Sequence, residues 1–392
     1  MRIACLAFTP LAEDARVQRT ASALSEAGHD VLLLARPPFP ENGAYRVQPL
    51  APLASPAMQR LSLVATQGPA TVLPKLASSL YWLSPSARLA LKAALSFAPD
   101  VVYCNDWLTL PVGTAVRRIC GAKLVYDAHE LATREHIQNW KWRLISHRAV
   151  VELEKRNIHA VDLVLTVSEG IAQALQNLYK LARKPTVLRN LPAYRAIPFR
   201  EIRAPTSILF HGLIRSERGL EELIDSMPDW KLSNRLVIRG YGQQYYIDSL
   251  RDRATSRGVA HRIAFEPRVS PDRLITEAAS ADIGYLALPG TTEHYEYALP
   301  NKLFEYLMAG LPVMATRRAE MAAILASTGA GFLTDLTPRA LAATLNGLSI
   351  DTLNEMRHAA LAAAKTLSWE HEKARLTDAV GSLASTMPAR ER

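Results

Sequence analysis

Residues 207–227, SILFHGLIRSERGLEELIDSM, contain one complete strand-to-helix unit. SILFHGL is a short apolar run that predicts a buried strand, and GLEELIDSM has the apolar spacing of a helix. The same alternation recurs along the chain, with NRLVIRGYG before YYIDSLRDRATSRG and, in the first half, RIACLAF before DARVQRTASALSEAG. Strands that are covered by helices on both faces read as near-continuous apolar runs. The pattern therefore predicts an α/β fold of doubly wound parallel sheets.

The length of 392 residues predicts two domains. The break is expected in residues 188–207, LRNLPAYRAIPFREIRAPTS, which contain three prolines and little periodicity. We expect domains at residues 1–195 and 205–365, with helices in residues 366–392 that brace them. The two domains would face each other across a cleft, with ligands at the carboxyl ends of the strands.

The charge of the chain is uneven. Residues 1–200 carry 24 Lys and Arg against 14 Asp and Glu, whereas residues 201–392 carry 22 against 23. A one-sided basic surface favours a polyanionic partner such as anionic lipid, although it is also explained as a solubility feature. Residues 45–98 are irregular, and are read either as helices packed on the first domain or as an element that contacts a bilayer. Residues 136–156 predict one basic helix with two tryptophans.

Targeting and redox signals are few. The apolar run at the N-terminus is too short for a signal peptide and predicts a strand, and no window is apolar enough for a spanning helix. The three cysteines lack metal-ligand spacing and indicate reduced, buried thiols, which suit a cytoplasmic protein.

The loop that follows SILFHGL predicts a phosphate site. Gly212 allows close approach of a ligand to the backbone, and Arg215 and Arg218 precede the start of a helix. Arginines that are simply solvated explain the same residues. Gly240, at the end of the next strand, belongs to an incomplete glycine fingerprint and is equally typical of a plain turn.

The helix in ALPNKLFEYLMAGLPV, residues 298–313, is expected to begin at Pro300. Lys302 and Glu305 share one face of it, so they predict either an intrahelical ion pair or a binding site. Lys302 opposes the helix dipole, and a bound anion would relieve that conflict. Glu305 is suited to accept hydrogen bonds from a ribose diol.

Polar side chains also end two strands of the first domain. YDAHEL brings Asp127, His129 and Glu130 to one strand end, and YCNDW brings Asp106 to another. Histidine and glutamate are the usual residues for proton or charge transfer, although a single strand-end histidine is more often structural. No metal-binding motif, Walker loop or Ser-His-Asp order stands at a credible position.

Several of these stretches together resemble the family-4 retaining glycosyltransferases with the GT-B fold. They include YDAHEL, VLTVSEGI, VLRNLP, HGLIRSERGLEELIDSM and YALPNKLFEYLMAGLPVMAT, which occur in the family's order. The resemblance implies a metal-independent transfer of a sugar from a UDP- or GDP-linked donor, without a cofactor, in cell-surface polysaccharide biosynthesis. The acceptor would be a glycan or a lipid-linked molecule, and the enzyme would be cytoplasmic or peripheral on the inner face of a membrane.

The resemblance also implies roles for single residues. Glu305 matches the second of two family glutamates separated by seven residues, and His129 would lie near the reacting centre, so both are expected to be catalytic. The implied donor-binding residues are Gly212, Arg215, Arg218, Gly240, Leu299, Asn301, Lys302 and Glu305. The implied acceptor-side residues are Arg16, Asp106, Asp127 and Glu130.

The chain departs from the family pattern at three positions. Tyr297 stands where the first glutamate is expected, with Glu296 one residue away. Leu213 replaces a frequent arginine, and Arg218 replaces a lysine but still suits phosphate. Two rival functions are a nucleotide-sugar epimerase of the same fold and a non-enzymatic protein that binds membrane or nucleic acid. No known nucleic-acid motif supports the second rival.

Overall fold

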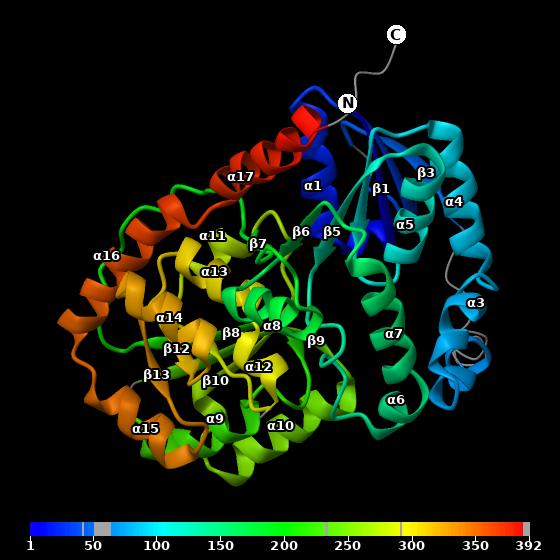
Figure 1. Cartoon of the computed structure of the whole chain (residues 1–392). Coiled ribbons are helices and arrows are strands. Elements are labelled where there is room, and N and C mark those ends of the chain that lie inside the picture. Colours follow the sequence, from blue (N-terminus) through cyan, green and yellow to red (C-terminus); the bar gives the residue numbers. More distant parts are fainter. Residues whose placement is uncertain (41–42, 51–63, 232–233, 291, 387–392) are drawn as a thin grey trace. The chain divides into compact units, whose positions relative to one another are not determined.

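The computed structural model describes residues 1–40, 43–50, 64–231, 234–290 and 292–386. The chain divides into two compact units: unit 1 comprises Met1–Arg189 and Glu372–Arg392, and unit 2 comprises Asn190–His371. Each unit is built around one parallel sheet (Figure 1).

Unit 1 contains a seven-stranded sheet in the order β3-β2-β1-β4-β5-β6-β7, and all neighbouring strands are parallel. Its strands are β1 (Arg2–Pro10), β2 (Asp30–Arg36), β3 (Arg46–Pro49), β4 (Val101–Asn105), β5 (Lys123–Ala128), β6 (Leu163–Thr166) and β7 (Thr186–Val187). Helix α1 lies on one side of this sheet, and α4 and α5 lie on the other (Figure 1). The strand order reverses between β1 and β4, which is where open parallel sheets bind ligands.

The helices of unit 1 are mostly short. They are η1 (Leu11–Glu13), α1 (Ala15–Glu26), η2 (Gly68–Thr71), η3 (Pro74–Leu76), α3 (Ala77–Tyr81), α4 (Pro85–Phe97), α5 (Leu110–Cys120), α6 (Trp140–Ile145), α7 (His147–Ile158) and α8 (Glu169–Tyr179). The chain returns to unit 1 in α17 (Trp369–Gly381) and η6 (Ser382–Thr386). Among the described helices of the whole chain, none is both long and apolar enough to cross a bilayer.

Unit 2 contains a six-stranded parallel sheet in the order β10-β9-β8-β11-β12-β13. Its strands are β8 (Ser207–Ile214), β9 (Arg235–Gly242), β10 (Ile263–Pro267), β11 (Ile283–Leu286), β12 (Val313–Thr316) and β13 (Gly331–Thr334). Its helices are α9 (Leu220–Ser226), η4 (Met227–Asp229), α10 (Gln244–Ser256), η5 (Ala260–Arg262), α11 (Leu274–Ala278), α12 (Glu293–Tyr297), α13 (Asn301–Met308), α14 (Ala319–Thr328), α15 (Pro338–Gly347) and α16 (Ile350–Thr366).

The opening stretch shows why this sheet is buried on both faces. Along β8, Ile208 and Phe210 belong to one apolar core, which includes side chains of α9, α10 and α15. Leu209, between them, belongs to a second core, which includes side chains of α11, α13 and α14. Successive side chains of a strand point to opposite faces, so both faces of β8 are covered by helices.

Three sequence expectations about helices were wrong in detail. Residues 136–156 form two helices rather than one. The Asn139 side chain caps the start of α6 at the amides of Lys141 and Trp142, and α6 ends at Ser146, where α7 begins. Residues 270–281, SPDRLITEAASA, predict a helix capped by Ser270, but Ser270 begins a turn and α11 starts four residues later. Pro300 is the N-cap of α13 and not its first helical residue.

The irregular region 45–98 is partly accounted for. Residues 51–63 lie outside the described residues, whereas α4 packs against α5 and against strands β1 and β2. The thiols of Cys5, Cys104 and Cys120 are free. Cys5 and Cys104 are buried, as the sequence predicts, whereas Cys120 is only partly buried.

Candidate functional site

Lys302 reaches from the first turn of α13 to the end of β8. A β-carbon at Gly212 would lie 2.7 Å from its Cε and 2.8 Å from its Nζ. Gly212 also has a φ of +117°, which side-chain-bearing residues rarely adopt. Gly240 pairs with Gly212 in the sheet, and its β-carbon would meet the Gly212 carbonyl oxygen at 1.8 Å. The close approach of β8 to β9 therefore explains Gly240 without a ligand.

Lys302, Arg215 and Arg218 form a cluster of positive charge in unit 2. Burial and the charge of Arg218 lower the pKa of Lys302 to about 8. Glu305 raises this pKa, and Arg215 lowers it further. Burial and Arg215 also lower the pKa of Arg218, whose buried Nε has no hydrogen-bond partner among the described residues. A bound anion would relieve this repulsion, and guanidinium and ammonium groups are the usual phosphate ligands.

Protein carboxylates do little to neutralise this cluster. Within the described part of the chain, neither Lys302 nor Arg218 forms an ion pair, and Arg215 reaches only the exposed Glu217, at 4.0 Å. The alternative of solvated arginines holds for Arg215, which is half exposed, but not for Arg218, which is mostly covered.

Glu305 pairs with His211 and not with Lys302. Its Oε2 lies 2.9 Å from His211 Nε2, so the imidazole donates a hydrogen bond to the carboxylate. His211 is held in turn, because its ring stacks on Tyr306 with 4.6 Å between centroids and its backbone N–H donates to the Tyr306 hydroxyl. The side chain of His211 is only 2% exposed, whereas that of Glu305 is 23% exposed. Glu305 is therefore a fixed, accessible carboxylate.

The remaining expected donor residues stand around the start of α13. The Asn301 Oδ1 atom accepts a hydrogen bond of 3.0 Å from Asn190. Leu299, in the loop that precedes α13, packs against the second apolar core of unit 2.

The departure at Glu296 and Tyr297 has a structural explanation in part. Glu296 accepts hydrogen bonds from Arg318, at 2.8 Å, and from the backbone N–H of Ala319, the first residue of α14. Arg318 donates further to the carbonyl of Leu288. The Glu296 carboxylate thus holds the start of α14, and Tyr297 ends the short helix α12.

In unit 1, Asp127 is the centre of a buried charged network. Arg16 donates to it at 3.0 and 2.7 Å, and Tyr103 donates at 2.8 Å. Although burial favours the neutral carboxyl, the charges of Arg16 and His129 lower the pKa of Asp127. Arg16 also donates to the carbonyl of Leu188, so it links β5 to the first residue after β7.

His129 lies between two carboxylates. Its Nδ1 is 3.3 Å from Asp106 and its Nε2 is 3.5 Å from Asp127. Burial opposes the charged imidazolium, but Asp106 and Asp127 outweigh it and raise the pKa of His129 to about 9. At neutral pH this side chain is a cation that can donate a hydrogen bond, and it is not a free base. Burial, Glu135 and Asp106 raise the pKa of Glu130 to about 8.

Two family models match the chain, one in each unit. Residues 14–190 match the glycosyl transferase 4-like domain, and residues 205–351 match the glycosyl transferases group 1. The chain belongs to the group 1 glycosyltransferase family. The family resemblance and the fold class that the sequence predicts are thereby confirmed.

Curated relatives of this glycosyltransferase are distant. An uncharacterized glycosyltransferase of Methanocaldococcus jannaschii is 26% identical over 236 residues, which are 55% of this chain and 57% of the relative. A glycogen synthase of Mycobacterium tuberculosis is 24% identical over 296 residues, which are 71% of this chain and 68% of the relative. The chain thus spans 57% of the length of the first relative and 68% of the length of the second.

Two solved structures share the fold over nearly the whole chain. Sucrose-phosphate synthase of Thermosynechococcus elongatus has a TM-score of 0.74 at 15% identity, with 99% of this chain and 100% of that chain covered. HepE of Anabaena, in complex with UDP, has a TM-score of 0.69 at 17% identity, with the same coverage.

Sequence reasoning about this glycosyltransferase missed His211 as part of the site. The prediction treated His211 only as the end of a strand, although a histidine directly before the loop glycine could have indicated a site residue. The structure brings His211, Gly212, Lys302 and Glu305 together in unit 2, and Arg16, Asp106, Asp127 and His129 together in unit 1.

Proposed function

We propose that this glycosyltransferase moves a sugar from a UDP- or GDP-linked donor, bound in unit 2, to a hydroxyl of an acceptor bound in unit 1. The observation that carries the proposal is the pair Lys302 and Arg218, which form no ion pair among the described residues although both are partly buried. Beside them stands Glu305, which His211 holds in place for a ribose diol. HepE, which shares the fold, is known in complex with UDP and with UDP-glucose, and this supports the same donor class.

The proposed reaction retains the configuration of the sugar. The acceptor oxygen bonds to the anomeric carbon on the face from which the diphosphate leaves, the bond from that carbon to the diphosphate oxygen breaks, and the acceptor proton passes to the departing diphosphate. Lys302, Arg215 and Arg218 stabilise the negative charge that develops on the leaving group. Because side chains supply this charge, the proposal expects full activity in the presence of a metal chelator.

Titration calorimetry with UDP, GDP and ADP tests the donor site. The wild type should bind one of them saturably, and Arg218→Ala and Glu305→Ala should weaken that binding roughly ten- to a hundred-fold. Arg251→Ala is the matched control, because this exposed arginine on α10 pairs with Asp248 on its own helix and lies over the ring of Phe265. Absence of binding to all three nucleotides would sink the proposal. Product analysis with and without added acceptors then separates transfer from epimerisation.

We also propose that the acceptor is a glycan or lipid-linked glycan of the cell surface, used at the inner face of a membrane. Support comes from a surface of unit 1 with exposed apolar side chains on η2, η3 and α6, here called the basic-apolar surface. Its apolar members are Val72, Leu73, Leu76, Trp140 and Leu144, and its basic members are Lys75, Lys141, Arg143 and Arg148. The two segments lie side by side. The Thr71 hydroxyl donates a hydrogen bond to the carbonyl of Leu144, and Arg148 donates one to the carbonyl of Thr71.

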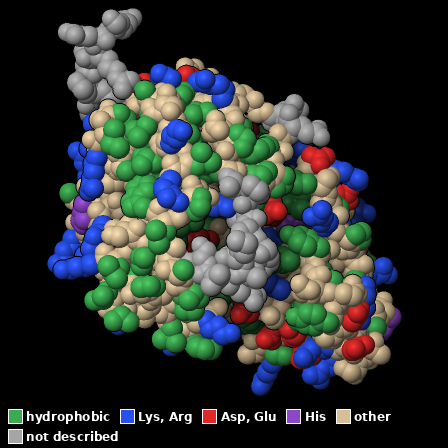
Figure 2. All heavy atoms as spheres, turned by 90° about the vertical axis from the view of Figure 1, so that its right-hand side faces the viewer, with side chains coloured by type: hydrophobic (Ala, Val, Ile, Leu, Met, Phe, Trp, Pro, Cys, Tyr) green, Lys and Arg blue, Asp and Glu red, His purple; other side chains and the backbone are tan. Residues whose placement is uncertain are grey.

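Figure 2 shows the face of the molecule that includes α3 and α4, where hydrophobic side chains gather with Lys and Arg between them. Such a mixture suits a surface of anionic lipid. Co-sedimentation with anionic vesicles at low salt tests this. The wild type should pellet with the vesicles, Val72→Asp/Leu73→Asp should not, and Tyr245→Asp, at an equally exposed site in unit 2, should behave as wild type. A wild type that stays in the supernatant would remove the membrane from the proposal.

A further inference from the structure

A cavity of about 350 Å³ lies between three helices of unit 1, where α7 packs against both α3 and α5 (Figure 1). Residues 111, 114, 115, 118 and 119 of α5 line it, and so do residues 153, 156 and 157 of α7. Spacings of three and four place each of these sets on one face of its helix. Ser78 of α3, and Trp82 directly after α3, complete the lining. This space is here called the helix cavity.

The charged side chains that line the helix cavity are both arginines. Arg156 pairs with Glu152 on its own helix, and its Nη1 donates to the Ser78 hydroxyl at 3.3 Å, so it links α7 to α3. Arg118 is exposed and forms no ion pair with any residue that the structure describes. The positive charge of Arg118 is therefore uncompensated at this place, which favours a ligand with one negative charge.

The helix cavity also has an apolar wall. Ile119 is 63% exposed, and Trp82 is only half buried, with its ring held edge-on against Tyr81 at 5.3 Å between centroids. Of the fourteen large hydrophobic side chains that are exposed in the described residues, nine lie between residues 64 and 144. Such a concentration marks an interaction surface rather than scattered exposure. Since η3 runs directly into α3, the helix cavity adjoins the basic-apolar surface.

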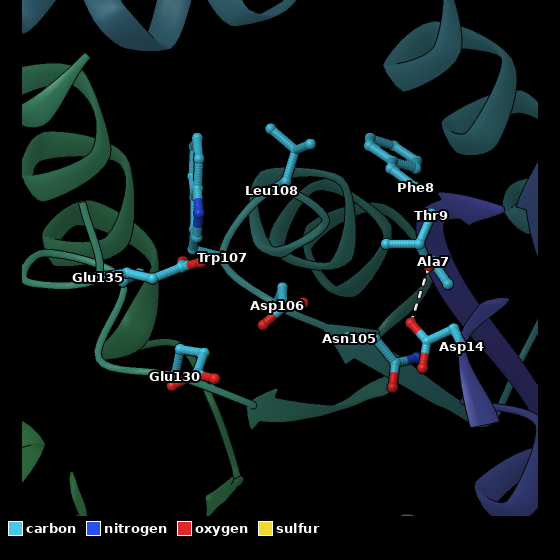
Figure 3. A pocket seen from close by; sticks show the side chains of 11 residues that line it. Ala7, Phe8, Thr9, Asp14, Asn105, Asp106, Trp107, Leu108, Glu130 and Glu135 are labelled. Atoms are coloured by element: carbon cyan, nitrogen blue, oxygen red, sulfur yellow. Dashed lines mark hydrogen bonds between the residues drawn. The ribbon is translucent and has the colours of Figure 1, made fainter. Parts of the chain in front are cut away.

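A different cavity of unit 1, shown in Figure 3, has the opposite character. It lies where β1 and β4 are neighbours, and its lining includes Asp14, Asp106, Glu130 and Glu135 but no Lys or Arg among the described residues. A phosphate finds no arginine or lysine there. Of these two cavities, the helix cavity is the one that suits an anion.

We propose that the helix cavity binds one molecule of an anionic phospholipid. Arg118 and Arg156 contact the phosphate, and Trp82, Ile119 and Leu153 cover the first methylene groups of the acyl chains. A free phosphate would leave the apolar wall in water, and a lipid without net charge would leave Arg118 without an anion. The inference rests on the proposed action at a membrane and adds to it a site for a single lipid.

Binding of short-chain lipids, used as monomers below their micelle concentration, tests the inference. By calorimetry, dihexanoyl phosphatidylglycerol should bind saturably and about tenfold more tightly than dihexanoyl phosphatidylcholine, the size of a charge-assisted hydrogen bond. Glycerol 3-phosphate, which lacks the chains, should bind more weakly than phosphatidylglycerol. Equal binding of the two lipids, tighter binding of glycerol 3-phosphate, or no saturable binding of phosphatidylglycerol would each overturn it.

Two exposed positions separate the charge from the apolar wall. Arg118→Gln should remove the preference for phosphatidylglycerol over phosphatidylcholine, with Arg183→Gln, at an exposed arginine elsewhere in unit 1, as the control. Ile119→Ser should weaken both lipids several-fold, because hydrocarbon burial is lost. Leu178→Ser is its control, since Leu178 of α8 is 46% exposed and lies outside the lining. A retained preference in Arg118→Gln, or unchanged affinities in Ile119→Ser, would contradict the inference.

The same samples distinguish this inference from the proposed function. Val72→Asp/Leu73→Asp, which should abolish co-sedimentation with vesicles, should bind monomeric phosphatidylglycerol as the wild type does, because neither residue lines the helix cavity. Loss of that binding would assign the lipid to the basic-apolar surface and overturn the inference. UDP binding reports the donor site of unit 2 separately.

Discussion

The ε-ammonium group of Lys302 lies against the backbone of Gly212, in the space that a side chain at position 212 would fill. The glycine at the end of β8 and the lysine at the start of α13 are thus one unit, although 90 residues separate them. Each is explained by the other, and together they present a positive charge at the carboxyl end of the central strand of unit 2.

Gly212→Ala should therefore disturb the nucleotide site. The new β-carbon would displace the Lys302 side chain and would also be strained at a φ of +117°. We expect UDP affinity to fall about tenfold or more by calorimetry, the size of a lost charge-assisted hydrogen bond. Gly347→Ala is the control, because no atom lies within 4 Å of its added carbon. Equal UDP affinity in the two variants would show that Lys302 does not contact the nucleotide.

Nucleotide affinity should depend on pH in a defined direction. Burial and Arg218 lower the pKa of Lys302 to about 8, so the free enzyme loses this positive charge as the pH rises from 7 to 9. UDP affinity should fall over that interval, and binding at pH 8 should take up protons, because the diphosphate favours the charged lysine. Lys302→Arg should flatten the profile, since an arginine stays charged. Calorimetry in two buffers of different ionisation enthalpy measures the proton uptake.

His211 should act as a positioning residue for Glu305. His211→Ala would leave the carboxylate without its 2.9 Å hydrogen bond, whereas His211→Gln keeps a donor. We expect His211→Ala to reduce the preference for UDP over 2′,3′-dideoxy-UDP and His211→Gln to restore part of it. A purely structural role would weaken both nucleotides equally, so the ratio of the two affinities decides.

The Arg16–Asp127 pair should be essential to the stability of unit 1. Arg16 is 4% exposed and Asp127 is fully buried, so removal of the arginine leaves the buried carboxylate with only part of its compensation, from His129 and Tyr103. Arg16→Leu should lower the free energy of unfolding by about 3–5 kcal/mol. Denaturant unfolding monitored within unit 1 measures this loss, with Arg19→Leu, a partly exposed arginine of the same helix, as the comparison. A loss of the same small size in both variants would mean that the network contributes little.

His129 should make unit 1 less stable in alkali. Its pKa is raised to about 9 by Asp106 and Asp127 against the opposing effect of burial. A raised histidine pKa contributes stability that is complete below the unfolded value near 6.5 and that disappears as the pH rises through 9. His129→Asn should remove this slope. Thermal melting between pH 6 and 10 would show it, and parallel curves for the two proteins would contradict the assignment of charge.

The sequence predicted the sheets well because both are buried on two faces. Strands such as β8 are unbroken apolar runs between loop residues, so their type and order along the chain could be read directly. Local side-chain capping was harder to foresee. Asn139 moves the start of the expected helix to Trp140, and nothing in its own residue type distinguishes a cap from a solvated amide.

The site divides in the same way. Gly212, Arg218, Lys302 and Glu305 could be proposed from the sequence because their residue types suit phosphate or ribose chemistry at strand and helix ends. The pairing of Glu305 with His211, and not with Lys302, could not be predicted from spacing, since His211 lies 94 positions away. Asp106 and Glu130 were expected at strand ends, but the approach of Asp14 to them was out of reach. It depends on which strands become neighbours: β1 and β4 are adjacent in the sheet but far apart in the chain.

The path of the chain has a consequence for dissecting the enzyme. Unit 2 is a single uninterrupted segment, whereas unit 1 takes its last residues from the far end of the chain, where Glu372 accepts the backbone N–H of Arg189 and Lys373 pairs with Glu26. Excision of residues 190–371 therefore gives a natural fragment for donor studies. Expression of unit 1 alone requires a linker that joins residues 1–189 to the C-terminal segment that begins at Glu372, because unit 2 is inserted between these two parts of the chain.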